Sequence, residues 1–281
     1  GLLLLLIVSV VIFLGVEALP GDTAQAILGQ SATPTALANL REEMGLDQPA
    51  LTRYFHWLGG ILTGDLGTAL TNKVDIATSI ASKLGNTLFL AGSAAAIAVP
   101  LAILLGVIAA RYAGRWPDKV ISAVTLTTIS LPEFVAAYFV IFFLTQVFPI
   151  FQPVSLVLPG MGFWAKLHAI ALPVIVLVMV CLAHMMRMTR AAILNVMQSA
   201  YIETAELKGL TPMQVVWRHA FPNAIAPVVS VVMLNLAYLV VGVVVVEVVF
   251  SYNALGKYLV DHVTKRDLPV GLFASLAVST L

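Results

Sequence analysis

AIAPVVSVVMLNLAYLVVGVVVVEVVF, the stretch from Ala224 to Phe250, decides the fold class of this chain. A helix needs about 20 apolar residues to cross roughly 30 Å of hydrocarbon. The stretch exceeds that length, and Glu247 is the only charged residue in it. We therefore expect it to cross a membrane as a helix.

Other stretches of the same kind run from Gly1 to Leu19, Thr87 to Ala110, Val120 to Phe148 and His168 to Met186, and a further one begins near Val270. The chain has 281 residues, of which 60% are hydrophobic and 10% charged, and its mean hydropathy is +0.99. Soluble domains are about half apolar and a quarter charged. The sequence thus predicts an all-α polytopic membrane protein with about six transmembrane helices in one domain, residues 1–281. We interpret both ends as truncated, the last helix included, and expect no cleaved signal peptide.

Lysines and arginines predict the orientation, because cytoplasmic loops hold an excess of them. The basic residues of the links after the second and fourth stretches are Arg111, Arg115, Lys119, Arg187, Arg190, Lys208 and Arg218. Both links, and both chain ends, are therefore expected in the cytoplasm. Lys257, Lys265 and Arg266 would lie outside, where Asp261 and Asp267 partly offset their charge.

The outer segment, residues 20–86, is too long to be a turn. It contains two helix-like stretches: Ala36 to Met44, which follows Thr33-Pro34 and stops at Gly45, and Pro49 to Leu58, which is punctuated by Gly59-Gly60. Threonine at an N-cap and glycine after a helix are typical boundary signals.

The cytoplasmic segment, residues 187–223, contains NVMQSAYIETAELKGLTPMQVVWRHAFP from Asn195 to Pro222. Its first part reads as an amphipathic helix that ends at Gly209, with Ile202, Ala205 and Leu207 near one side. Thr211, Pro212 and Gln214 then predict a capping box that starts a second short helix. Two helices joined by a glycine could transmit the movement of a docked partner into the spans, or could simply connect them.

This segment resembles the EAA loop of ABC-importer permeases in Glu203-Thr204-Ala205, Gly209 and Phe221-Pro222. Three residues depart from the pattern of that loop: Thr204, His219 and Phe221. Four further segments are similar to the dipeptide/oligopeptide (peptide/nickel) branch of these binding-protein-dependent importers: LPGD at 19–22, GLDQP at 45–49, GDLGTAL at 64–70 and VVVVEVVFSYNALGKYLVD at 243–261. That branch commonly has Trp-Pro where this chain has Tyr252-Asn253.

The resemblance implies a permease subunit that imports di- or oligopeptides across a bacterial or archaeal plasma membrane. Implied partners are a homologous second permease, two ABC ATPase subunits, an extracytoplasmic binding protein and membrane lipid, with no nucleic acid. The ATPase-coupling residues would be Glu203, Ala205, Lys208, Gly209 and Pro222. No cofactor is expected in this chain, since ATP and magnesium would bind the ATPases, and Gly256-Lys257 does not fit a phosphate loop. Permeases that resemble this family also carry nickel or sugar-like solutes.

Polar groups at membrane depth suggest the translocation pathway or gate, because an ionisable group within a span usually faces a cavity or a partner. The candidates are Glu247, Asn235 and Glu133. Glu247 could equally be an interfacial carboxylate that caps a helix or pairs with Lys257. Pro132 and Pro173 are expected to kink their spans, and Pro100 to end or bend the second span.

Other classes of function lack their signals. Cys181, His184 and the methionines beside them are soft ligands, but they adjoin Arg187 and Arg190, which repel cations, so no metal site is expected. An ion-coupled carrier would need inverted repeats and pathway carboxylates. The sequence has no internal repeat and few carboxylates in its apolar stretches. An intramembrane hydrolase would need HExxH or GxSxG, and neither motif occurs.

Overall fold

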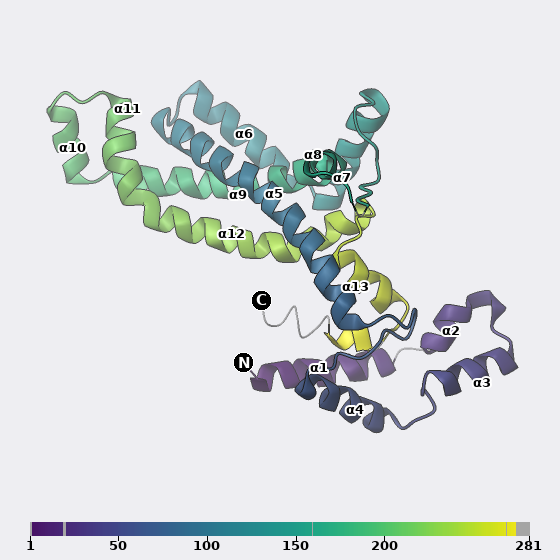
Figure 1. Ribbon diagram of the computed structural model, residues 1–281. Helices are drawn as coiled ribbons and strands as arrows, with labels where there is room; N and C mark the ends of the chain where they lie inside the picture. Colours follow the sequence, from purple (N-terminus) through teal and green to yellow (C-terminus); the bar gives the residue numbers. More distant parts are fainter. Residues whose placement is uncertain (1, 19–20, 159, 268, 274–281) are drawn as a thin grey trace. The chain divides into compact units, whose positions relative to one another are not determined.

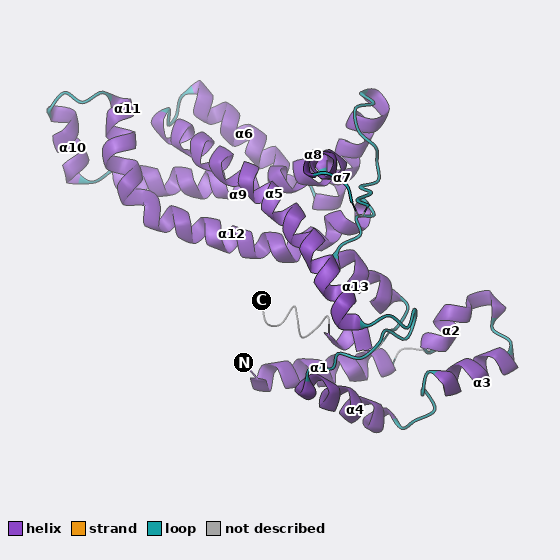
Figure 2. Ribbon diagram, viewed as in Figure 1, coloured by secondary structure: helices purple, strands orange, loops and turns teal. Residues whose placement is uncertain are grey.

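The computed structural model describes residues 2–18, 21–158, 160–267 and 269–273. These residues are mostly helical and contain no strand, only an isolated bridge between Thr68 and Asp75 (Figures 1 and 2). They divide into two compact units, residues 1–86 with 254–281 and residues 87–253. The predicted all-α class is confirmed for the described part of the chain.

The first unit contains α1 (Leu2–Glu17), α2 (Thr23–Leu28), a 3-10 turn (Gly29–Ser31), α3 (Pro34–Glu43), α4 (Ala50–Thr63) and α13 (Leu255–Thr264). Helix α5 (Ile76–Arg111) begins in this unit and continues into the second. The second unit contains α6 (Trp116–Ser130), α7 (Glu133–Ile141), α8 (Phe163–Ala169), α9 (Ala171–Met197), α10 (Ala200–Leu207), α11 (Pro212–Val215) and α12 (Phe221–Val249). π-helical turns follow α7 at Phe142–Val147 and α11 at Val216–Ala220.

Among the described residues, three helices are long and apolar enough to cross a membrane: Ile76–Arg111, Ala171–Met197 and Pro212–Leu239. A fourth span results if α6 and α7 are counted as one bent span. The apolar part of α1 is shorter, and most of the predicted last span, residues 274–281, lies outside the described residues. The multi-pass character is therefore confirmed, while the count of six remains a prediction.

The predicted stretch from Val120 to Phe148 is not one straight helix. The axes of α6 and α7 differ by 104° across a short break. Leu131, which precedes Pro132, has φ −90° and ψ 129°, because the proline ring disfavours helical geometry in the residue before it. Pro132 therefore separates two helices, which is more than the predicted kink.

Pro173 and Pro100, the other two prolines predicted to affect their spans, lie within helices. Pro173 lies in the first turn of α9, where its missing N–H would have no helical partner in any case. Helix α5 continues through Pro100, and α12 continues through Pro227.

In the segment predicted to lie outside, residues 20–86, α3 confirms the first predicted helix. The Thr33 hydroxyl accepts a hydrogen bond from the Ala36 N–H at 3.3 Å, and Gly45 follows the helix with φ 66°. The predicted end of the second helix at Gly59-Gly60 is wrong, since α4 runs on to Thr63. A Cβ on Gly60 would lie 2.9 Å from the Asp65 carbonyl oxygen. Gly60 therefore permits the following loop to approach the helix.

Within the second unit, α9 and α12 pack side by side, and α6 and α7 also pack against α9 (Figure 1). Helix α5 approaches α9 closely at Gly106, where an added Cβ would lie 2.8 Å from the Thr189 Cβ. A side chain at residue 106 would separate these two backbones.

Candidate functional site

The segment predicted to be cytoplasmic and to serve in coupling forms a tight bend, residues 200–215, which we call the elbow. Gly209 joins α10 to α11 with φ 80°, a left-handed conformation that non-glycine residues rarely adopt. The Gly209 N–H donates to the Glu206 carbonyl at 2.9 Å, which closes the end of α10. The predicted glycine-ended helix is confirmed in position and in geometry.

The predicted capping box at the start of α11 is also confirmed. Thr211 and Gln214 form it, with the Thr211 N–H donating to Gln214 Oε1 at 2.9 Å. The second helix is not short, however. It passes through the π-helical turn at Val216–Ala220 directly into α12. Pro222 is exposed and lies in the first turn of α12. It has no N–H to donate, and the π-helical turn, which is wider than an α-helical turn, directly precedes this part of the helix. The elbow is therefore continuous with a membrane span.

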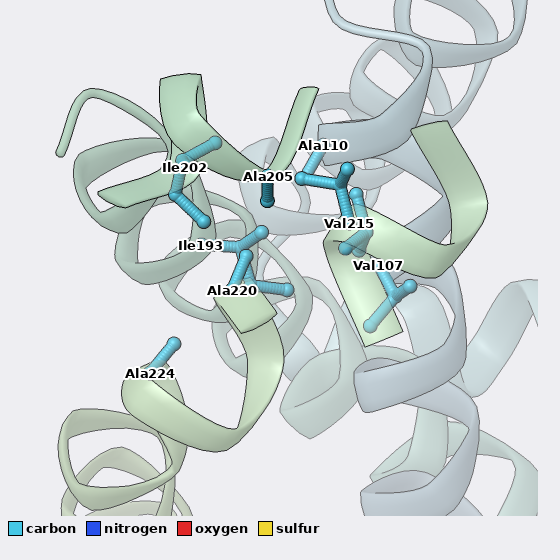
Figure 3. Close-up of a cluster of buried hydrophobic side chains, with 9 residues drawn as sticks. Val107, Ala110, Ile193, Ile202, Ala205, Val215, Ala220 and Ala224 are labelled. Carbon is cyan, nitrogen blue, oxygen red and sulfur yellow. The ribbon is translucent and has the colours of Figure 1, made fainter. Parts of the chain in front are cut away.

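One side of the elbow packs into an apolar core that joins it to the ends of α5 and α9 (Figure 3). The buried residues of this core are Val107, Ala110, Ile193, Ile202, Ala205, Val215, Val216, Ala220 and Ala224. Interiors packed in this way are stiff and transmit displacement. A push on the elbow would thus reach three long helices: α5, α9 and α12.

The other side of the elbow is exposed and has a mixed character. Glu203, Glu206, Lys208 and Gly209 are exposed, and the Leu207 side chain has an exposed fraction of 82%. The prediction that Leu207 lies near the same side of the helix as Ile202 and Ala205 is wrong, because it is five and two positions away from them, and only residues three or four apart share a helix face. An exposed leucine among charged residues is a feature that the sequence reasoning missed.

The proposed coupling residues divide accordingly. Glu203, Lys208 and Gly209 lie on the exposed side, and Pro222 is exposed beyond the π-helical turn. Ala205 has an exposed fraction of only 6% and belongs to the core. It supports the elbow from within, whereas the other four residues are accessible to a partner.

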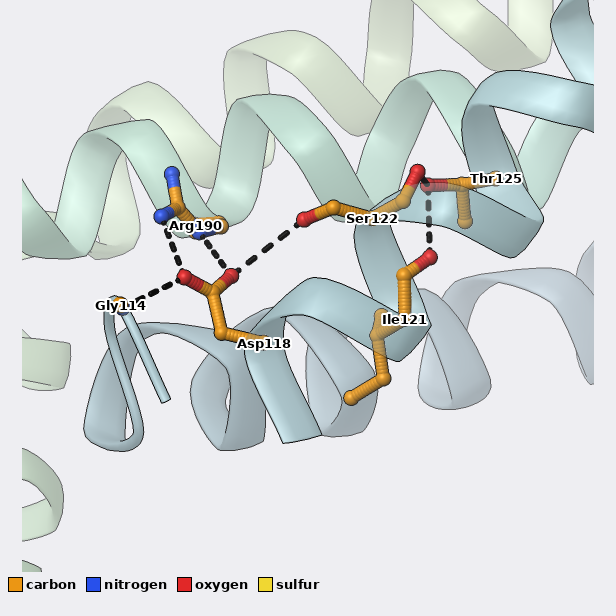
Figure 4. A network of polar contacts seen from close by, with 6 residues as sticks. All are labelled: Gly114, Asp118, Ile121, Ser122, Thr125 and Arg190. Carbon is orange, nitrogen blue, oxygen red and sulfur yellow. Dashed lines mark hydrogen bonds and ion pairs between the residues drawn. The ribbon is translucent and has the colours of Figure 1, made fainter. Parts of the chain in front are cut away.

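An ion pair joins the links that follow the second and fourth predicted spans (Figure 4). Arg190 Nε and an Arg190 terminal nitrogen donate to the two Asp118 carboxylate oxygens at 2.7 and 2.8 Å. Asp118 also accepts the Gly114 N–H at 2.8 Å and the Ser122 hydroxyl at 3.3 Å. A direct contact requires both links to lie on the same side of the membrane, as the distribution of basic residues predicted.

Two of the three predicted pathway residues line one cavity in the second unit, with a volume of about 510 Å³. Glu133 and Asn235 lie in its wall with Cys181, His184 and Tyr238. The Asn235 side-chain nitrogen donates to the Val231 carbonyl at 2.9 Å, which leaves its amide oxygen open to accept. The cavity therefore offers several polar groups between α7, α9 and α12.

Glu247 has a different environment. Its side chain is fully buried, and Glu247 Oε1 accepts a hydrogen bond from the Thr87 hydroxyl at 2.7 Å. It is not among the residues that line the cavity. Glu247 thus joins α12 to α5 and is separate from the other two pathway candidates.

The described part of the chain contains no candidate metal-binding site. No three His, Cys, Asp or Glu side chains gather there as they would around a metal ion. Cys181 and His184 both line the cavity that contains Glu133, together with several apolar side chains.

Comparisons with known proteins agree with this architecture. Residues 102–281 match the family described as "Binding-protein-dependent transport system inner membrane component", and residues 1–91 match the N-terminal family of the same transport systems. Similar relatives include the glutathione transport system permease protein GsiC of Shigella flexneri serotype 5b (strain 8401) and of Escherichia coli O6:H1. Each is 37% identical over 266 residues, which make up 95% of this chain and 84% of the relative.

GsiC of Salmonella choleraesuis (strain SC-B67) is 36% identical over the same proportion of both chains. The two family matches together cover nearly all of the sequence. By these matches, and by the apolar spans described above, the chain belongs to the binding-protein-dependent inner membrane components, the permease subunits of ABC importers, in their peptide/nickel branch.

Proposed function

We propose that this chain is one of two homologous permease subunits in an ATP-driven importer of short peptides, and that its elbow receives the movement of a separate ATPase. The observation behind this proposal is the division of the elbow into an exposed side with Leu207 and a buried side packed on α5 and α9. An exposed apolar side chain surrounded by charges suits a protein contact. The buried side passes force onward.

The mechanism is a rigid-body one. A displaced elbow carries α12 with it, because α11 continues into α12 without a break in the helix. The shared core moves the ends of α5 and α9 as well. Tilting of packed helices around a central site is a known route to alternating access.

Peptides are the favoured solute because the relatives are named for the transport of glutathione, which is itself a small peptide. The cavity that contains Glu133 and Asn235 would form one half of the pathway, and the second permease would supply the other half. Glu247 would act at a gate between α5 and α12. Nickel complexes or sugar-like solutes are the alternative, and the ligand of the binding protein that co-purifies with the importer decides between them.

The remaining partners follow from this scheme. Two ATPase subunits would bind ATP and magnesium, and an extracytoplasmic binding protein would deliver the solute. Both chain ends would be cytoplasmic in a bacterial or archaeal plasma membrane, with residues 20–86 outside. An ion-coupled carrier is not retained, since the chain belongs to an ABC-importer family.

Substitution of Gly209 tests the coupling role. A Cβ at residue 209 would meet nothing within 4 Å, so the only cost of a side chain there is the positive φ. Gly209→Val should disfavour this conformation strongly, whereas Gly209→Asn should be tolerated because asparagine adopts it more readily. We expect G209V to lower peptide uptake by about five- to thirtyfold at equal ATP hydrolysis, which corresponds to a conformational cost of roughly 1–2 kcal/mol at residue 209.

The measurement is uptake and ATPase activity of the assembled importer in proteoliposomes, with co-purification as the check on assembly. G209N is the matched control and should retain coupled uptake. Equal uptake by G209V and the unchanged protein would contradict the role of the elbow.

A further inference from the structure

One face of α9 lines two adjoining cavities. Leu177, Val180, Cys181, His184 and Met188 contribute to the cavity that contains Glu133. Met188 also lines the second cavity, of about 360 Å³, together with Arg187, Arg190, Ala191, Ser122 and Leu126. Residues three or four positions apart share one side of a helix. The two cavities are thus consecutive parts of one surface along α9.

At one end of this surface, Glu133 provides a carboxylate that no side chain neutralises. It is half-buried and forms no hydrogen bond or ion pair with the described residues. Among the described residues, no lysine or arginine lines its cavity, and its titratable neighbours there are Cys181, His184 and Tyr238. Glu133 is also the first residue of α7, where the helix dipole favours a negative charge. A buried carboxylate is costly without a cation, so this position favours a cationic ligand.

At the other end, Arg187 provides the opposite charge. Arg190, which lines the same cavity, is bound to Asp118 through both of its hydrogen bonds. Arg187 is exposed and forms no hydrogen bond or ion pair with the described residues. Its guanidinium group can therefore accept a carboxylate in the bidentate geometry that arginine favours.

The separation of these two charges fits a short peptide. Cys181 lies in the wall beside Glu133, and Arg187 follows it on the same helix by six residues. That offset is about 9 Å along the axis, at 1.5 Å per residue. An extended peptide spans about 3.3–3.6 Å per residue, so three residues cover the distance, and the long side chain of Arg187 reaches the carboxylate of a dipeptide.

We propose that this surface binds a zwitterionic dipeptide or tripeptide, with its α-ammonium group on Glu133 and its α-carboxylate toward Arg187. The open amide oxygen of Asn235 can accept an N–H of the peptide backbone between them. This inference rests on the proposed function. It specifies that the permease itself recognises the two charged ends of the peptide. Glu133 and Arg187 are specificity-determining residues on this view.

Photocrosslinking of the assembled importer without its binding protein tests the proposal, because the selectivity of the binding protein then plays no part. The probes are alanyl-benzoylphenylalanine, its N-acetyl derivative and its C-terminal amide. We expect the free peptide to label the α9 and α12 walls about tenfold more than either derivative, as for a charge-assisted hydrogen bond in a partly dry site. Glu133→Gln should abolish the preference over the N-acetyl probe, and Arg187→Gln the preference over the amide.

Glu42→Gln is the matched control, since Glu42 is an exposed carboxylate of α3, and it should leave both preferences unchanged. Equal labelling by the three probes in the unchanged protein would overturn the proposal. Labelling only outside the cavity would also overturn it. So would an E133Q variant in which labelling by all three probes falls by the same factor. Peptide uptake by the unchanged importer is measured separately: its absence would contradict the proposed function, whereas the labelling ratios report on Glu133 and Arg187 alone.

Discussion

Asp118 and Arg190 show at the scale of single residues how two distant links are held together. The Asp118 side chain is 6% exposed, and that of Arg190 is 30% exposed. A buried carboxylate that loses its only cation is left with an uncompensated charge, which costs more than the pair itself contributes. The two residues should therefore be sensitive to any change that keeps one charge and removes the other.

Arg190→Gln should lower the stability of the purified protein by about 3 kcal/mol, because Asp118 would remain buried and unpaired. Arg190→Lys should recover only part of this loss, since lysine cannot donate to both carboxylate oxygens in the same fork. The measurement is the thermal unfolding midpoint in detergent. Ser122→Ala is the control and should have little effect, because its hydrogen bond to Asp118 is long at 3.3 Å. A midpoint in R190Q equal to that of the unchanged protein would show that the pair is not structural.

Two leucine-sized residues of α10 separate packing from docking at the scale of the element. Ile202 has an exposed fraction of 2% and lies in the core under the elbow, whereas Leu207 has one of 82%. They are five residues apart on the same short helix. A stability effect and a partner effect can therefore be assigned to opposite sides of it.

Ile202→Ala should destabilise the elbow by about 3 kcal/mol, because it leaves a cavity against α5 and α9. Limited proteolysis within residues 198–211 should become faster. Leu207→Ala should leave proteolysis unchanged but reduce the amount of ATPase that co-purifies, by about tenfold, as for an anchor side chain of an interface. If L207A retained its ATPase in full, the exposed side of the elbow would not be the contact.

The break between α6 and α7 also belongs to this scale. Pro132 and the extended geometry of Leu131 place Glu133 in the first turn of a new helix. In a straight helix the same carboxylate would lack the dipole of a helix N-terminus. The break thus creates the charged end of the cavity.

The orientation of the spans is a property of the whole molecule. The predicted scheme places the elbow in the cytoplasm and residues 20–86 outside. Lys208→Cys and Glu42→Cys, each in a Cys181→Ala background, place single exposed thiols in these two regions. A membrane-impermeant maleimide should label K208C only in inside-out vesicles and E42C only in right-side-out vesicles. Labelling of K208C from the outside would reverse the orientation and remove the basis for coupling to an ATPase.

The sequence by itself determined the helical class, three of the long spans, the capping box at Thr211 and the glycine bend at residue 209. Each of these depends on residues close together in the chain: apolar runs set by the thickness of the bilayer, and caps set by local hydrogen bonds. The elbow could be recognised from its pattern for the same reason.

Only the tertiary structure decided which side of each helix is buried. It placed Leu207 outward and Ala205 inward, separated Glu247 from Glu133 and Asn235, and brought Asp118 to Arg190. It also showed that Gly60 serves a close approach of two backbones and does not end a helix. These outcomes depend on contacts between distant segments, and the periodicity of a short or uniformly apolar helix contains no information about which neighbours it will meet.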